Sequence, residues 1–160
     1  MGFREWVGTR LVTVDSIYGL ILYAALIAAV SDDESHPVEV LVFSLFSLII
    51  FWGAHVYAGT IVNHVGNSPL HVAIGKAMRH SSGMLLAAIL PSVPLVLGAF
   101  GVLNDDDSVD YALLIVTVLL AVLGYIALKA RGANIAVRIF GAIGSALFGT
   151  LIIALNAAVH

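Results

Sequence analysis

Five long apolar stretches run along the chain, and the short segments between them hold most of the charged residues. A membrane-crossing helix needs about 20 apolar residues to span roughly 30 Å of hydrocarbon. The stretches also lack the alternation of apolar and polar residues that is typical of barrel strands. The pattern therefore predicts an all-α integral membrane protein, a single transmembrane domain over residues 1–160. Its five predicted transmembrane helices are residues 11–30, 38–61, 83–103, 109–128 and 134–157.

The segments between these stretches alternate in the sign of their charge. Two connections are acidic, around residues 32–39 and 105–110. The basic residues precede the first stretch, lie between the second and third, or lie around the junction of the fourth and fifth: Arg4, Arg10, Lys76, Arg79, Lys129, Arg131 and Arg138. Because short loops rich in Lys and Arg stay in the cytoplasm, we expect a multi-pass protein of the cell inner (plasma) membrane, N-terminus inside and C-terminus outside.

The longest connection, residues 62–82, carries a helix signal of its own. Ser68 can cap a helix, and Pro69 suits a first helical position, where its missing N–H costs nothing. Leu70 and Ile74 then recur on one side. We expect a short interfacial helix here, between the second and third transmembrane helices, and its simplest role is that of a basic connector held against anionic headgroups.

Composition narrows the possible functions. The chain is 61% hydrophobic and 11% charged, whereas soluble domains carry about 25% charged residues, so water-soluble enzyme classes are excluded. A formal net charge of -3 offers no basic surface to nucleic acid, and we expect none as a partner. Without cysteines there is no disulfide, thiolate ligand or thiol nucleophile. The sequence contains no HExxH motif and no plausible Ser–His pair, the patterns that would indicate an intramembrane enzyme. We therefore predict neither an enzyme nor a bound cofactor.

Asp15 is the most unusual residue within the apolar stretches, because it lies about five residues inside the first one. A carboxylate at that depth costs a few kcal/mol and should face the bundle interior, a partner or water. Gly19 and Tyr23 share its helix face. His55 lies at a similar depth in the second stretch, where Ser44 and Ser47 begin a mildly polar stripe that leads to it.

Asp15 and His55 can therefore meet, either as a proton relay or as two ligands of a divalent transition metal carried as substrate. Two ligands are an incomplete set, so water, a carbonyl or a symmetry mate would have to complete it. Tyr23, Ser44, Ser47 and Arg138 are further candidates along a transport path. A structural alternative is an ion pair between Asp15 and Arg138, which lies near the same depth.

Small residues suggest where helices approach each other. Gly141, Ser145 and Gly149 repeat every four residues in the last stretch, a pattern that allows close contact within the bundle or across a homodimer. Pro91 and Pro94 should bend the third transmembrane helix.

Two segments, LLAAILPSVPLVLGAF (85–100) and LLAVLGYIALKARG (119–132), followed by the glycine-spaced last helix, resemble the last three helices of the vacuolar iron transporter family. The resemblance implies five helices, an inside N-terminus, a dimer and metal transport. It places Asp15, in VDSIYG (14–19), on the family's first-helix metal-binding aspartate, and His55, in AHVYAG (54–59), near a glutamate position. The chain departs from the family in lacking its glutamate-rich cytoplasmic domain and second-helix methionine.

We therefore expect a small membrane transporter that exchanges a divalent metal cation for protons at a site near the cytoplasmic side. It would be embedded in the lipid bilayer, as a homodimer through the Gly- and Ser-rich helix faces. The alternative is a non-transporting membrane scaffold or accessory subunit, whose polar groups only hold the bundle together.

Overall fold

The computed structural model describes residues 13–31, 35–65 and 69–159, and within them the chain is all-helical. Its five helices are α2 (Val14–Val30), α3 (Pro37–Val65), α4 (Leu70–Ala99), α5 (Asp105–Ala130) and α6 (Ile135–Val159). Helices α3 to α6 are long and apolar enough to cross a membrane, and α2 is a shorter apolar helix of 17 residues. The predicted class, an all-α multi-pass membrane protein, is therefore confirmed, with four helices that meet the length of a full crossing.

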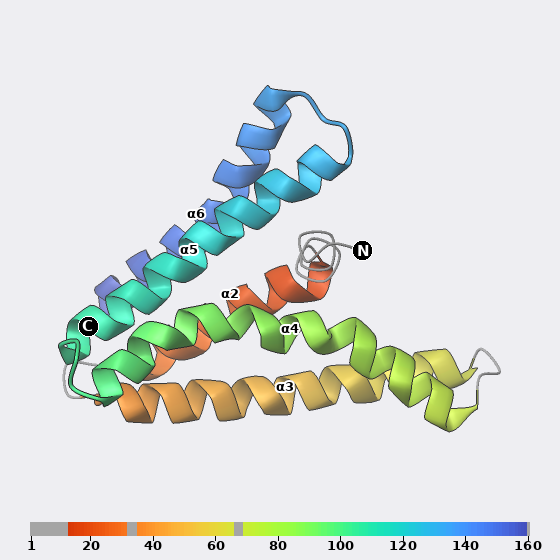
Figure 1. Cartoon of the computed structure of the whole chain (residues 1–160), viewed down its shortest axis with the longest axis horizontal. Coiled ribbons are helices and arrows are strands. Elements are labelled where there is room, and N and C mark those ends of the chain that lie inside the picture. The colour runs from red at the N-terminus through yellow and green to blue at the C-terminus, as the bar shows by residue number, and fades with distance from the viewer. Residues whose placement is uncertain (1–12, 32–34, 66–68, 160) are drawn as a thin grey trace.

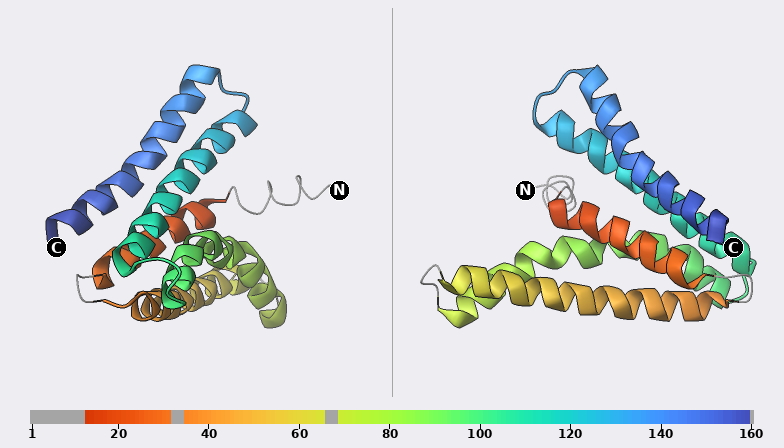
Figure 2. Two further views of the ribbon diagram at one scale, coloured as in Figure 1. Left: turned by 60° about the vertical axis from the view of Figure 1, so that its left-hand side comes forward. Right: turned by 180° about the vertical axis from the view of Figure 1, so that it is seen from behind.

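The helices form two antiparallel hairpins that diverge like the arms of a V, with α2 between them (Figure 1). One arm is α3 with α4 and the other is α5 with α6, and the same arrangement is seen from the side and from behind (Figure 2). The start of α2 and the α3–α4 and α5–α6 connections lie toward one end, which we call the basic end because Lys76, Arg79, Lys129, Arg131 and Arg138 lie near it. The opposite end, where α5 begins, is the acidic end.

The core of the bundle follows α2. Leu20, Tyr23 and Ile27 of this helix are almost completely buried, among apolar side chains from the other helices. Gly19 lets α2 approach α4 closely, because a Cβ at this position would lie 2.8 Å from the backbone of Met84. The small residue therefore fixes α2 against α4 by backbone contact, as is usual where helices pack in a membrane.

One predicted element is wrong. The short interfacial helix expected between the second and third transmembrane helices is not separate, because α4 runs without a break from Leu70 to Ala99. Ala73 and Ala77 are buried, and Ala77 packs against Gly59 of α3. This packing holds the first turns of α4 in helical form, and Gly83 costs a helix only about 1 kcal/mol relative to alanine. The proposed cap, Ser68, lies outside the described residues.

The glycine-spaced face of α6 packs against α5 of the same chain. A Cβ at Gly149 would lie 2.8 Å from the Thr117 Cα, and one at Gly141 would lie 3.1 Å from the Gly124 carbonyl oxygen. Gly144, on another side of α6, faces open space. The close contact predicted from this pattern is thus formed within the bundle. Pro91 and Pro94 lie inside α4, which follows an arched course (Figure 1).

Candidate functional site

Asp15 lies in the first turn of α2, two residues after Thr13, which caps the helix. The Thr13 hydroxyl accepts a hydrogen bond from the Ser16 backbone N–H at 3.1 Å and so stabilises the start of the helix. The positive end of a helix dipole favours a carboxylate in this turn. Asp15 is only 5% exposed, so the helix end partly compensates a carboxyl group that has lost most of its water.

Two imidazoles from two other helices face this carboxyl group. The Nε2 atom of His55, on α3, lies 3.4 Å from Asp15 Oδ1. The Nε2 atom of His80, on α4, lies 3.7 Å from Asp15 Oδ2. The two histidines remain accessible, since their side chains are 44% and 77% exposed. The structure thus brings Asp15 and His55 together and adds His80. Each imidazole lies beside a different oxygen of the Asp15 carboxyl group.

The sequence pattern does not predict the place of His80, which lies within the connection expected over residues 62–82. Its place follows from the packing of α2 on α4. Both helices run away from the basic end, and Gly19 packs against Met84. One helical turn earlier on each helix lie Asp15 and His80, which therefore meet. The unbroken course of α4 from Leu70 is what brings His80 to this site.

Among the described residues, no arginine or lysine forms an ion pair with the Asp15 carboxyl group. Its Oδ2 atom is buried without a hydrogen-bond partner, and within the described ranges the ion pairs of Asp15 are those with the two histidines. The alternative pairing with Arg138 is not formed. The Arg138 Nε atom donates instead to the Ala133 carbonyl oxygen, at 2.7 Å, just before α6 begins.

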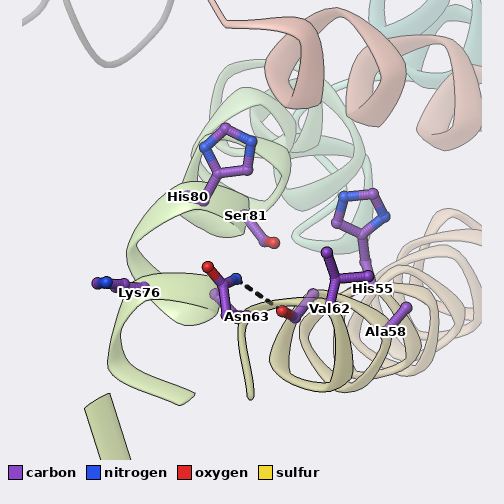
Figure 3. Close-up of a pocket in the computed structure, with 9 residues that line it drawn as sticks. His55, Ala58, Val62, Asn63, Lys76, His80 and Ser81 are labelled. Carbon is purple, nitrogen blue, oxygen red and sulfur yellow. Dashed lines mark hydrogen bonds between the residues drawn. The ribbon is translucent and has the colours of Figure 1, made fainter. Parts of the chain in front are cut away.

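His55 also borders a pocket between α3 and α4, close to the basic end. Its ring stacks on Tyr18 of α2, with centroids 6.3 Å apart and planes inclined by 28°. Below the ring the two helices enclose a pocket of about 530 Å³. Figure 3 shows His55 and Asn63 on the α3 wall, and His80, Ser81 and Lys76 on the α4 wall. The Asp15 site therefore adjoins a pocket that is open to the outside of the protein.

A second polar group lies two helical turns further along α2. The Tyr23 hydroxyl and the Ser92 Oγ atom are 2.6 Å apart. Because Ser92 itself donates to the Ala88 carbonyl oxygen, the phenol is the donor to Ser92. Ser44 is buried beside this group and donates to the Val40 carbonyl oxygen at 2.6 Å. Ser47 is half-buried on α3, and its hydroxyl makes no described contact with this group.

The donor atoms at Asp15 do not form a preformed metal centre. Among the residues that the structure describes, no three His, Cys, Asp or Glu side chains are grouped so that they could hold a metal ion. A carboxylate and imidazoles are suitable ligands for divalent transition metals, but Asp15, His55 and His80 would have to converge further to bind one together.

Comparison of the chain with protein-family models, curated proteins and solved structures finds no match. The resemblance to vacuolar iron transporters thus stays a prediction, and function has to be inferred from the site.

Proposed function

We propose that the protein is a small membrane transporter that exchanges a divalent metal cation for protons, with Asp15 as the group that both ions share. His55 and His80 flank this group and take up or release protons as the cation arrives and leaves. The support comes from one observation: a buried carboxyl group faces two titratable imidazoles and forms no ion pair with an arginine or lysine of the described residues.

The reason is electrostatic. A buried carboxylate needs a positive partner, since the loss of its hydration costs several kcal/mol. Arginine would supply a permanent one, and the site would then be a structural ion pair. A proton, a protonated imidazole or a metal cation supplies one that can be exchanged. The site at Asp15 is of the exchangeable kind.

The open arrangement of the three side chains suits a transported ion better than a resident one. A transport site has to bind its ion strongly enough to admit it and weakly enough to release it. Water from the adjoining pocket would complete the coordination shell of the metal. Because carboxylate and imidazole ligands bind metal in their deprotonated forms, metal entry would release protons.

The Tyr23–Ser92 hydrogen bond supplies the next polar step toward the acidic end. About 12 Å separates Asp15 from Tyr23 along the helix axis, at 1.5 Å per residue. We include Tyr23, Ser92 and Ser44 in the path, and we leave Arg138 out because its guanidinium is bonded at the other arm.

We further propose that the basic end faces the cytoplasm and that the membrane is the cell inner (plasma) membrane, on the basis of the charge difference between the two ends. If the protein is a homodimer, its interface involves a surface other than the Gly141 and Gly149 face of α6, since α5 occupies that face.

The test is ion flux in proteoliposomes that contain a pH-sensitive dye. We expect an inward gradient of Mn²⁺, Fe²⁺, Co²⁺ or Zn²⁺ to drive proton movement in the wild type and not in Asp15→Asn. Asp110→Asn is the matched control, because Asp110 is an exposed acid on α5 outside the site. Equal proton flux in Asp15→Asn and the wild type would contradict the proposal, and the absence of flux with every metal would leave the scaffold interpretation in its place.

A further inference from the structure

The pocket between α3 and α4 has a chemical character that cation transport does not explain. Its polar side chains include an ammonium group, Lys76, which repels cations. Lys76 is exposed and forms no ion pair with any described residue. Figure 3 shows the Lys76 side chain at the rim of the pocket, directed outward, and an unpaired cation at the rim of a pocket is suited to an anionic group.

A buried hydroxyl group also lines the pocket. Ser81 is 2% exposed, and its hydroxyl has no hydrogen-bond partner among the described residues. Figure 3 shows this hydroxyl directed from α4 into the space between the helices. Serines in these helices usually bond to the carbonyl three or four residues earlier, as Ser82 and Ser92 do. Ser81 does not, so its hydroxyl is available to a ligand.

Three apolar side chains, those of Ala58, Val62 and Ala77, also line the pocket, together with Asn63 and the two histidines, His55 and His80. Asn63 uses its amide N–H₂ to bond the Gly59 carbonyl oxygen at 2.7 Å. A ligand that fills this pocket therefore has a charged head and an apolar body.

The position of the pocket along α3 further limits the class of ligand. At 1.5 Å per residue, His55 and Asn63 lie about 27 and 39 Å from Pro37, at the other end of the helix. The hydrocarbon layer is about 30 Å thick, so with Pro37 at its far edge the pocket crosses the boundary between hydrocarbon and headgroups. At that boundary, the molecule that combines an anionic group with an apolar body is a phospholipid, and its anionic group is the phosphate.

We propose that the α3–α4 pocket binds the phosphate group of an anionic phospholipid, with Lys76 and Ser81 as its ligands. The flexible Lys76 side chain closes on the phosphate as a point charge, and the Ser81 hydroxyl donates to a phosphate oxygen. Ala58, Val62 and Ala77 contact the glycerol and the upper acyl chain. This site uses neither Asp15 nor a metal, although His55 and His80 of the proposed transport site also line the pocket.

Native mass spectrometry of delipidated protein in detergent tests this proposal, with added phosphatidylglycerol, phosphatidylcholine or inorganic phosphate. We expect phosphatidylglycerol to bind more tightly than phosphatidylcholine. Lys76→Gln should weaken phosphatidylglycerol binding about fivefold, because a lysine near an anionic surface contributes about 1 kcal/mol. Ser81→Ala should weaken it about threefold, through the loss of one hydrogen bond.

Lys129→Gln is the matched control, since it removes the same charge from an exposed lysine near the basic end but outside the pocket. Lys76→Arg, which keeps the charge, should retain most of the binding. The proposal is overturned if Lys76→Gln and Ser81→Ala bind as the wild type does, or if Lys129→Gln loses as much as Lys76→Gln. Millimolar inorganic phosphate that displaces the lipid fully would show a free phosphate site and reject the lipid as its source.

Discussion

The two ends of the bundle each carry an Asp–His pair, and the pairs differ in their surroundings. At the acidic end, His36 Nδ1 lies 3.1 Å from Asp105 Oδ2, and the Asp105 side chain is 49% exposed. Near the basic end, the Asp15 side chain is 7% exposed and faces two imidazoles. An exposed pair is screened by water and salt and contributes about 0–1 kcal/mol.

In this comparison the shorter distance does not belong to the pair that we propose as functional. The pair at Asp105 is closer, but water can replace either partner at little cost. The carboxyl group of Asp15 has lost most of its water, so its charge depends on a positive partner close by. Burial together with exchangeable partners is what makes the Asp15 site a candidate for ion transport.

The two ends should differ most in how the removal of one histidine at each end changes metal-driven proton flux. His80→Gln leaves Asp15 Oδ2 without its imidazole, and we expect metal-driven proton flux to fall about tenfold or more, as for the loss of groups that support a metal ligand. His36→Gln should leave the flux unchanged. The flux assay in proteoliposomes measures both, and equal losses in the two variants would show that neither end is the site.

A second change tests whether the packing of α2 on α4 sets the Asp15 site. Gly19→Ala places a Cβ 2.8 Å from the Met84 backbone, and such overpacking costs about 1–3 kcal/mol. We expect a lower thermal midpoint in detergent and a reduced flux. Gly53→Ala is the control, because a Cβ there meets nothing within 4 Å. If Gly19→Ala were as stable as Gly53→Ala, the close contact would be refuted.

A smaller effect is expected in the middle of the bundle. Tyr23→Phe removes the hydroxyl group that donates to Ser92. The loss of such a hydrogen bond costs about 0.5–1.5 kcal/mol of stability. Ser92 keeps its bond to the Ala88 carbonyl oxygen, so no donor is left unpaired. Thermal unfolding should show the loss, whereas Tyr57→Phe, at a residue 69% exposed, should behave as the wild type.

The smallest effect should be at the acidic end itself. Asp105→Asn should lower the stability by about 1 kcal/mol at most, and 0.5 M salt, roughly, should remove the difference because exposed charges are screened. Thermal midpoints at low and high salt measure this. A larger loss that salt does not reduce would mean that the Asp105 pair, too, is shielded from solvent.

Part of this fold and site could be predicted from the sequence, and part could not. Apolar stretches long enough to cross a bilayer identify the helices, and the depths of Asp15 and His55 bring these residues to one level. The prediction of a separate interfacial helix was wrong because residues 62–82 were interpreted as a connection, whereas packing against α3 keeps α4 helical from Leu70 onward. His80 was missed for the same reason. The divergence of the two arms, which separates Arg138 from Asp15, depends on packing that no local pattern encodes.

The central claim, that the positive partner of Asp15 is exchangeable, is tested most directly by proton release. Mn²⁺ is added to the purified protein in weakly buffered detergent solution, and the pH is recorded for the wild type, Asp15→Asn and Asp110→Asn. We predict that the wild type and Asp110→Asn release protons on metal addition and that Asp15→Asn does not. Equal release from all three proteins would contradict the account.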